Sequence, residues 1–473
     1  MAETYDVAII GSGPGGYGAA FRAVKYGLKT ALIEKDAKFG GTCLHVGCIP
    51  TKALLFQAEV YESFKRAQEF GIACKGFSLD WAQMQARKQQ IVDRHATGLA
   101  ALMKKNKVTT LAGFGRLKGA GSIEVSGGGP GKAGASKKTE VRAKNIILAT
   151  GSTPRLLPGL EEDGERILTN NSVLELKKVP KSMVVIGAGA VGVEFASIYN
   201  TFGTEVTILE MLPRAVPLED EEISAALEKA FKRRGIRVET EAKVESVKKT
   251  AKGASVTYRD TQGKPQTATA ETVLVAVGRK PNTEGIGLEK TKAKVERGFV
   301  HVNEWMETAE PGLYAIGDIV AGLPQLAHAA TWEGFAAVAK IAGKNATPVR
   351  NDRIPNCTYC EPQVASVGLT EKQARKAGYQ VKAGKFPFLA NSKASILGQH
   401  QGFIKVVAEE KYGELLGVHI IGPLATEVIA EAVAALQLEA TVDDLMALVH
   451  AHPTLWEAMA DAVGSLRGLT TNI

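Results

Sequence analysis

Residues 5–36 read YDVAIIGSGPGGYGAAFRAVKYGLKTALIEKD and decide the first part of the fold. An apolar run leads into a glycine-rich turn, a helical pattern follows, and a second apolar run ends at Glu34. This order predicts a strand–helix–strand unit that binds a dinucleotide. Gly11 permits the tight turn, Gly13 lets the backbone approach a pyrophosphate, and Gly16 lets the helix pack closely on the strand.

The same pattern occurs again 176 residues further along, from Lys181 to Leu212. The matching positions are Gly187, Gly189, Gly192 and Glu210. In each unit the helix N-terminus favours the negative charge of a phosphate, and the acid at the strand end is placed to accept from ribose hydroxyls. One glycine motif alone would be weak evidence. The complete order, found twice, predicts two dinucleotide-binding units rather than two unrelated glycine-rich turns.

Two later segments also look alike. NIILATGSTPR at 145–155 and TVLVAVGRKPN at 272–282 each run from an apolar strand through a glycine into a proline-containing turn. Each is expected to close the nucleotide-binding domain that precedes it. Between the first unit and the second, residues 118–138 are rich in Gly, Ser and Lys and predict a long flexible hairpin loop with no chemistry of its own.

Length and composition describe an ordinary folded protein. The 473 residues suggest roughly three domains. Hydrophobic residues make up 45% and charged residues 23%, which excludes a mostly disordered chain, and five cysteines do not make a disulfide framework. Lys and Arg number 58 against 50 Asp and Glu. Because no nucleic-acid motif accompanies this net charge of +8, a solubilising surface is favoured over a polyanion partner.

The N-terminal residues are not expected to form a signal peptide. Acids at Glu3 and Asp6 flank an N-terminal apolar run that is too short for a signal-peptide core. No later stretch approaches ~18 uninterrupted apolar residues, the length that spans a bilayer. These features predict a cytoplasmic protein without a membrane segment.

A cysteine pair lies in GGTCLHVGCIPTK, residues 40–52. The spacing of Cys43 and Cys48 fits neither a zinc site nor a thioredoxin-like CxxC, and no metal site is expected. Two small buried thiols are the alternative reading. However, a loop directly after the first nucleotide turn would carry both thiols to the flavin of a bound FAD, where Lys52 would favour thiolate.

With these motifs the whole chain resembles the pyridine nucleotide-disulfide oxidoreductase family. The resemblance rests on GGTCLHVGCIPTK, the two glycine units, ATG at 149–151, GLYAIGDIV at 312–320 and HAHPTLWEA at 450–458. It implies an α/β fold with two Rossmann-like domains, for FAD and NAD, and a C-terminal α+β dimerisation domain. The expected boundaries are 1–152 for the first part of the FAD domain with the redox disulfide, 153–283 for the NAD domain, 284–350 for the second, central FAD part, and 351–473 for the interface domain.

The family pattern also implies roles for the matching residues. Cys48 would be the thiol next to the flavin and Cys43 the thiol that exchanges with substrate. Lys52 would lie near the reactive ring nitrogen, paired with Glu194. The implied cofactor contacts are Gly11, Gly13, Gly16, Glu34, Gly41, Thr42, Lys52, Gly115, Ala149, Thr150, Gly151, Asp318, Leu326, Ala327 and His328 for FAD, and Gly187, Gly189, Gly192, Glu210, Val244 and Gly278 for NAD.

Thiol exchange needs a base, because the thiolate is the attacking species and imidazole titrates near working pH. The family pattern assigns this base to His452, oriented by Glu457, with His450 secondary. Pro453 suggests that a helix starts there. The resemblance further implies that the base reaches the disulfide of the partner subunit, so the active site would be shared across a homodimer.

Three features depart from the pattern. His45 stands where the family usually has Asn, and is expected to be a solvent-facing bystander rather than to tune a thiol pKa. Thr51 stands where Ser is common. CTYC at 357–360 is a true CxxC, but the family carries no redox pair there, so it is read as two buried or surface thiols.

Within the family, the chain most resembles the branch that oxidises protein-bound dihydrolipoamide and reduces NAD. A carboxylate at Glu210 would repel the extra phosphate of NADP, which argues against the glutathione-type branch; Arg214 lies beyond the strand end. No cysteine follows Cys360, which argues against the mercuric branch. A flavin-binding protein without turnover is a further alternative. Lipoyl domains of 2-oxo acid dehydrogenase or glycine cleavage complexes are the expected partners, with no nucleic acid.

Overall fold

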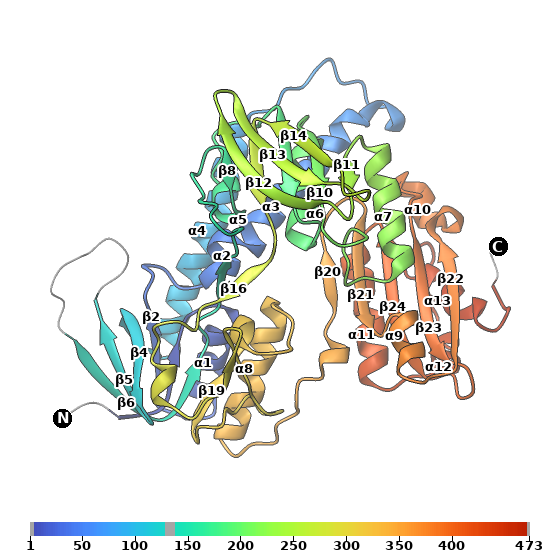
Figure 1. Cartoon of the computed structure of the whole chain (residues 1–473). Helices are drawn as coiled ribbons and strands as arrows, with labels where there is room; N and C mark the ends of the chain where they lie inside the picture. Colours follow the sequence, from blue (N-terminus) through green and yellow to red (C-terminus); the bar gives the residue numbers. More distant parts are fainter. Residues whose placement is uncertain (1–3, 128–137, 471–473) are drawn as a thin grey trace. The chain divides into compact units, whose positions relative to one another are not determined.

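The computed structural model describes residues 4–127 and 138–470. The chain forms two compact units, each assembled from three separate stretches of sequence (Figure 1). The first contains Met1–Ala53, Gln83–Arg155 and Arg279–Asn351, and the second contains Leu54–Ala82, Leu156–Gly278 and Asp352–Ile473. Each unit therefore unites residues that are far apart along the chain.

The first unit is built on a mainly parallel sheet. Its spatial order is β3 (Thr109–Ala112), β2 (Thr30–Glu34), β1 (Thr4–Ile10), β6 (Thr139–Leu148), β5 (Ser122–Ser126) and β4 (Phe114–Gly119), with β19 (Leu313–Ala315) also paired to β6. Along β1, Val7 and Ile9 belong to one hydrophobic cluster, whereas Ala8 and Ile10 belong to another. The two faces of the central strand are thus both covered, which explains its continuous apolar run.

Helix α8 (Ala327–Ile341) comes from the last stretch of this unit and packs along α1 (Pro14–Lys25). Small residues permit close contact: a Cβ at Gly15 would lie 2.9 Å from the Ala330 carbonyl oxygen, and one at Gly334 would lie 2.9 Å from the Gly15 carbonyl oxygen. The remaining elements of the unit are α2 (Gly41–Val46), β7 (Ser152–Pro154), β16 (Arg279–Pro281), η2 (Leu288–Lys290), β17 (Val295–Glu296), β18 (Phe299–Val300) and η3 (Gly317–Ile319).

The prediction of a loop over residues 118–138 is partly wrong. Ser122–Ser126 forms β5, which pairs antiparallel with β4 and with β6. Ile123 and Val125 alternate inward and are buried, so two apolar side chains outweigh the Gly- and Ser-rich composition. Residues 128–137 of the expected loop lie outside the described residues.

The second unit repeats the nucleotide-binding arrangement. Its parallel sheet has the order β11 (Arg237–Glu239), β10 (Glu205–Leu209), β9 (Ser182–Ile186), β15 (Thr272–Val275) and β8 (Ile167–Leu168). An antiparallel meander of β12 (Lys243–Thr250), β13 (Gly253–Arg259) and β14 (Pro265–Ala270) precedes β15. The helices of this part are α5 (Asn170–Val173), α6 (Ala190–Thr201) and α7 (Glu221–Arg233).

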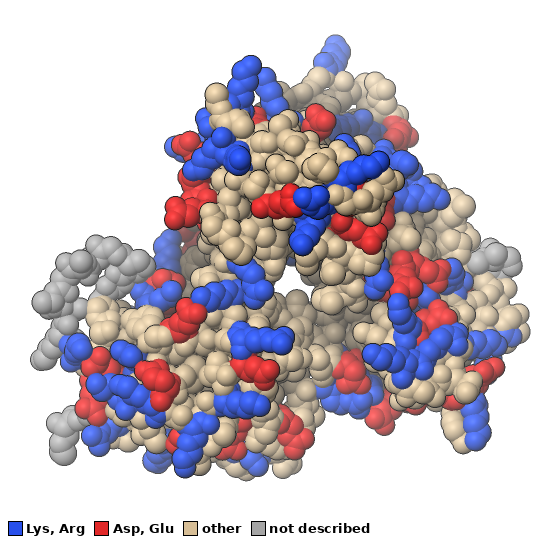
Figure 2. Space-filling view, viewed as in Figure 1, with Lys and Arg blue, Asp and Glu red and all other residues tan. Residues whose placement is uncertain are grey.

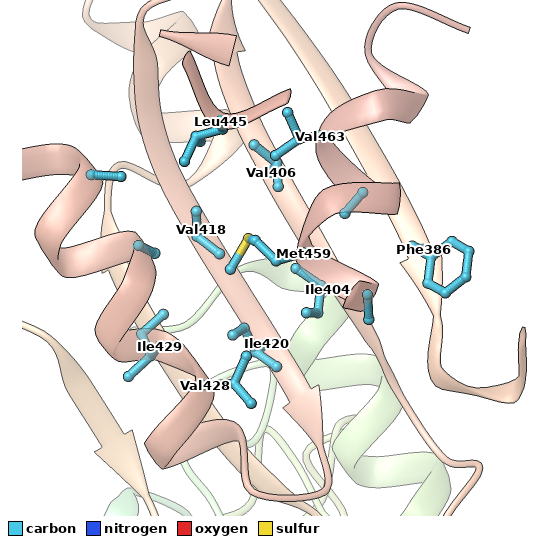
Figure 3. Packing of buried hydrophobic residues seen from close by; sticks show 14 of the residues in the cluster. Phe386, Ile404, Val406, Val418, Ile420, Val428, Ile429, Leu445, Met459 and Val463 are labelled. Carbon is cyan, nitrogen blue, oxygen red and sulfur yellow. The ribbon is translucent and has the colours of Figure 1, made fainter. Parts of the chain in front are cut away.

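The C-terminal stretch of the second unit is an antiparallel sheet with helices on it. The order is β20 (Asn356–Thr358), β21 (Gln363–Gly368), β24 (Leu415–Gly422), β23 (Phe403–Glu409) and β22 (Val381–Pro387). Helices α11 (Ala425–Gln437), α12 (Val442–Met446) and α13 (Glu457–Ser465) contribute to its core, where Val428 and Met459 meet Val418 and Ile420 of β24 (Figure 3). The other elements are α9 (Glu371–Lys376), η5 (Phe388–Ala390) and α10 (Ser392–Leu397).

Three elements lie where the stretches of the two units meet along the sequence: α3 (Cys48–Lys65), α4 (Trp81–Lys105) and η4 (Asn351–Arg353). The short helix η1 (Ala67–Phe70) belongs to the second unit. Among the residues that the structure describes, none of the helices is both long and apolar enough to cross a bilayer. On the face shown in Figure 2, basic and acidic side chains are interspersed.

Candidate active site

The two glycine-rich turns are held in the same way. The Glu34 carboxylate accepts hydrogen bonds from the Ser12 amide (2.8 Å) and the Asp36 amide (2.8 Å). At the equivalent positions, Glu210 accepts from the Ala188 amide (2.6 Å) and the Leu212 amide (2.8 Å). Both acids are buried, so each fixes its own turn at the carboxyl end of the parallel strands. The duplication that the sequence predicts therefore extends to individual hydrogen bonds.

The glycines of the two turns are required for different reasons. A Cβ at Gly11 would lie 2.2 Å from the Ala149 carbonyl oxygen, and one at Gly16 would lie 1.9 Å from the Gly11 carbonyl oxygen. Gly187 and Gly192 show the same conflicts with their own neighbours. By contrast, a Cβ at Gly13 or Gly189 would meet nothing of the described chain within 4 Å. Packing alone does not require glycine at these two positions, whereas close approach of a phosphate does. The residues present therefore fit a dinucleotide at each turn.

The two cysteines of the first unit lie side by side. Cys43 is in the short helix α2 and Cys48 begins α3. A hydrogen bond between the thiols, followed by burial, raises the pKa of Cys43 far above its ordinary value, while the charge of Lys52 acts in the opposite direction. Gly47 permits this tight link, because a Cβ there would lie 2.9 Å from the Thr42 carbonyl oxygen. Sulfur atoms in this relation are placed to form a disulfide when two electrons and two protons are removed.

Tyr17 adds an aromatic side chain from α1 to the cysteine pair. Burial raises the pKa of its phenol, and the charges of Cys43 and Cys48 raise it further. The helix that follows the first glycine turn thus delivers both a phosphate-binding end and a neighbour of the dithiol. Tyr17 was not among the predicted site residues, although it lies on the first turn of the helix that follows the glycine motif.

A partly buried arginine connects the cysteine loop to Asp318. The Arg279 guanidinium donates to the Ser152 hydroxyl (2.6 Å), to the Ser152 carbonyl (2.7 Å) and to the Thr42 hydroxyl (3.4 Å). Ser152 in turn donates to the Asp318 carboxylate, which lies 3.8 Å from Arg279. Burial lowers the pKa of Arg279, whereas the charges of Asp318 and Cys48 oppose this shift. Arg279 and Ser152 were not predicted, although they follow the predicted Gly278 and Gly151.

The other expected flavin contacts belong to the same unit. Gly41 approaches the first glycine turn, since its Cβ would lie 2.9 Å from the Gly13 Cα. Gly115 packs tightly inside β4, with Ile10 and Ile33 side chains each 3.1 Å from a Cβ built there. The start of α8 contains Leu326 as its N-cap, followed by Ala327 and His328. The three residues directly after β6 are Ala149, Thr150 and Gly151.

Two further expected residues lie elsewhere in the fold. Val244 in β12 packs, partly buried, against the core beside the second parallel sheet. His45 is half-buried, and its Nε2 donates a 2.8 Å hydrogen bond to the Phe39 carbonyl. Because that bond fixes the ring to the backbone, the prediction that His45 is a solvent-facing bystander is only partly correct.

The histidine and glutamate of the C-terminal motif form a pair. His452 Nδ1 lies 2.8 Å from Glu457 Oε1, and the other carboxylate oxygen accepts from the Thr454 amide at 2.7 Å. Burial opposes the shift, but these two bonds hold the pKa of Glu457 below its ordinary value. The ring itself is 70% exposed, and with Nδ1 turned to Glu457 its Nε2 is the nitrogen available for proton transfer.

The expected helix start at Pro453 is wrong, because α13 begins at Glu457. Before the helix, the Thr454 amide donates a hydrogen bond to the Glu457 carboxylate. His450 forms a separate pair, with its Nε2 3.0 Å from Glu431 Oε1 on α11. Each histidine of the motif is therefore paired with a carboxylate, His452 with Glu457 inside the motif and His450 with Glu431 outside it.

Glu194 is held within the second unit by the segment that contains the CTYC motif. Its Oε1 accepts from the Tyr359 amide at 2.9 Å, and the side chain is 4% exposed. Cys360 is buried, and burial raises its pKa well above the ordinary value, so it is an unreactive thiol. The reading of CTYC as structural thiols fits this geometry. The pairing of Glu194 with Lys52 stays a prediction.

Arg234 ties the same segment to α6. It donates to the Ser197 hydroxyl (2.8 Å), the Thr201 hydroxyl (2.8 Å) and the Glu361 carbonyl (2.6 Å). Glu361 also donates its amide to Ser197 at 3.0 Å. Ser197 and Thr201 lie on the helix face that carries Glu194, so Arg234 supports the position of that carboxylate indirectly.

Removal of this arginine is expected to destabilise the protein. Arg234→Met leaves buried acceptors without donors, and we expect a loss on the order of 2–4 kcal/mol in the free energy of unfolding, measured with urea. Arg233→Met is the matched control, because Arg233 is exposed and bonds only the Gln401 side chain among the contacts that the structure shows. Its loss should stay within about 0.5 kcal/mol. Equal effects of both substitutions would contradict the role of Arg234.

This fold and site define a class: an oxidoreductase with two dinucleotide-binding folds and a vicinal dithiol. The family described as pyridine nucleotide-disulphide oxidoreductase matches residues 5–334, and its dimerisation domain matches residues 354–463. The chain belongs to this family.

Similar proteins extend over the whole chain. A dihydrolipoyl dehydrogenase of Bacillus subtilis is 45% identical over 471 residues, with 98% of both chains covered. One of Thermus scotoductus is 46% identical over 467 residues, again with 98% of each covered. The solved structure of LpdA from Mycobacterium tuberculosis superposes with a TM-score of 0.88 at 28% identity, covering 97% of this chain and 98% of the other. Among the described residues there is no cluster of three or more metal-ligating side chains.

Proposed function

We propose that the chain is a dihydrolipoamide dehydrogenase that oxidises protein-bound dihydrolipoamide and reduces NAD through FAD. The contact between Cys43 and Cys48, next to the first nucleotide turn, is the observation that carries this proposal. Full-length relatives with this name support it. The direct test is a steady-state assay of NAD reduction with dihydrolipoamide. Glutathione disulfide and mercuric ion are tested separately as electron acceptors, with the reduced nicotinamide cofactor as the electron donor. Faster turnover with either acceptor would refute it.

FAD fits the first unit and NAD the second. Glu34 and the open position at Gly13 suit an adenosine and its pyrophosphate, and Asp318 and Arg279 supply partly buried charges near the cysteine pair. Glu210 and Gly189 repeat the arrangement for NAD. When bound, FAD accepts two electrons from the dithiol and passes them to NAD as a hydride.

The residues of the chain then perform the thiol exchange. A thiolate of dihydrolipoamide attacks Cys43, the bond between Cys43 and Cys48 breaks, and Cys48 leaves as a thiolate. His452 Nε2 takes the proton from the second substrate thiol, whose sulfur attacks the first and releases Cys43 as the cyclic disulfide forms. Glu457 holds the ring at Nδ1 and so fixes its orientation. Lys52 favours the thiolate state of the pair.

The partners proposed are a second copy of the chain and a lipoyl domain. The match to the dimerisation domain supports a homodimer. In this dimer, His452 of one subunit would serve the cysteine pair of the other, as the resemblance implies. Lipoyl domains of 2-oxo acid dehydrogenase or glycine cleavage complexes would present the substrate, and a cytoplasmic location stays a prediction.

A strong preference for NAD over NADP is expected from Glu210. A carboxylate that repels a 2′-phosphate and bonds the ribose hydroxyls should give a difference on the order of 100-fold or more in kcat/KM. Glu210→Gln keeps an acceptor for the Ala188 amide and should narrow that ratio by roughly 10-fold, because the repulsion is lost. The equivalent Glu34→Gln serves as the control: it should weaken FAD binding and leave the NAD/NADP ratio unchanged. Comparable wild-type efficiency with the two cofactors would overturn the assignment.

A further inference from the structure

A carboxylate of the first unit lies buried outside the redox pair. Glu333 in α8 has no exposed surface, and its Oε2 accepts a 2.6 Å hydrogen bond from the Gly317 amide. Its Oε1 has no hydrogen-bond partner in the part of the chain that the structure describes. A buried charge with one unsatisfied oxygen is costly, so its retention in the middle of an alanine-rich helix points to a role.

Glu333 lies between two segments that the proposed flavin site uses. Gly317 has φ 72° and turns the chain into Asp318, so the bond to its amide fixes the backbone that carries the Asp318 carboxylate. The next residue, Gly334, contacts the Gly15 carbonyl on the first turn of α1, where a Cβ would come within 2.9 Å. The carboxylate therefore supports the acid near the cysteine pair and sits beside the phosphate-binding helix end.

Its protonation responds to the charges around it. Burial raises the pKa of Glu333 to about 7, the Gly317 amide lowers it, and the negative charge of Asp318 raises it. Asp318 is the charged group that acts on it from η3. The other titratable groups on the elements packed around Glu333 interact elsewhere. On α1, Tyr17 lies near the cysteine pair, Arg22 lies over the Phe335 ring, and Lys25 is at the far end of the helix. On α8 and β19, Lys340 lies over Trp305, His328 is at the exposed start of α8, and Tyr314 is near Glu307.

We propose that Glu333 is a positioning residue of the flavin site that takes up a proton when FAD binds and so makes FAD affinity fall as pH rises. The inference rests on the proposed binding of FAD in the first unit. A pyrophosphate on the adjacent glycine turn adds negative charge, which favours the neutral form of the carboxyl. One proton is then bound together with FAD wherever free Glu333 is ionised, and no other bond changes. The neutral carboxyl keeps an oxygen that accepts from the Gly317 amide.

The test titrates FAD into the apoprotein at several pH values and follows flavin fluorescence. For the wild type, the Kd is expected to rise by about 10-fold between pH 6 and pH 8.5, since the free carboxyl ionises within this window. Glu333→Gln keeps an acceptor for Gly317 but cannot titrate, so its Kd should change by less than about twofold. Glu304→Gln removes an exposed carboxylate of the same unit and should follow the wild type.

A purely structural role would give a different result. Glu333→Gln would then shift the Kd by the same factor at every pH, with the wild-type slope retained, and the proposal would be overturned. Proton uptake gives a measurement that does not depend on this variant folding. Calorimetry of wild-type FAD binding at pH 7, in two buffers of different ionisation enthalpy, should show uptake of roughly half a proton; no uptake would also refute the inference. Failure of the wild type to bind FAD at any pH would instead refute the proposed function.

Discussion

Cys43→Ser and Cys48→Ser are each expected to reduce turnover with dihydrolipoamide by at least ~1,000-fold, because a serine oxygen cannot take part in disulfide exchange. The two variants should differ in the absorption spectrum. Cys48 is expected to lie next to the flavin, so Cys48→Ser should abolish the long-wavelength absorbance of a thiolate beside the flavin. Cys43→Ser leaves Cys48 able to produce it. The two residues belong to different helices, α2 and α3.

The matched control is Cys74→Ser. Cys74 lies in the second unit, and among the hydrogen bonds of the described residues its sulfur makes only a long contact of 3.7 Å with the Gly76 carbonyl. Its replacement should leave turnover within about twofold of wild type. Stopped-flow spectra recorded during anaerobic titration with dihydrolipoamide would follow all three variants. Near-normal turnover of Cys43→Ser would exclude the dithiol mechanism.

His452→Gln is expected to cut dithiol-to-NAD turnover by roughly 100-fold to 10,000-fold, the usual range for a general acid–base group. FAD content should not change, because His452 belongs to the C-terminal part of the second unit and FAD is proposed to bind in the first. Electron transfer from NADH to a quinone or one-electron acceptor bypasses the disulfide and should survive the substitution. A parallel loss of the quinone activity would show that His452 has another role.

Mixed dimers test whether the site is shared between subunits. Chains with His452→Gln and chains with Cys43→Ser are each inactive in their own dimers. If they reassort at random, half the dimers are mixed and each has one intact site, so about a quarter of wild-type activity should return. Native mass spectrometry would establish that mixed dimers are present. Their presence without recovered activity would place the whole site within one chain.

Much of the fold and the site was predictable because it depends on local patterns. The turns at Gly11 and Gly187 require glycine because a Cβ at either position would collide with a neighbouring carbonyl, and Glu34 and Glu210 stand at strand ends. The spacing of Cys43 and Cys48 places both thiols at the junction between the short helix α2 and the longer helix α3. Such signals depend on residues close together in sequence, and sequence patterns report these directly.

Other features were decided only by the tertiary structure. Arg279 meets Ser152 and Thr42, and Glu333 meets Gly317, through contacts between segments that the sheet and helices bring together. Strand β5 forms because two buried side chains gain more from packing than its Gly- and Ser-rich surroundings lose, and this balance is absent from composition. The sequence by itself determined the duplicated nucleotide-binding units, the cysteine pair and the family. The tertiary structure decided which buried charges support them, because burial and long-range contact set the cost and the partner of a charge.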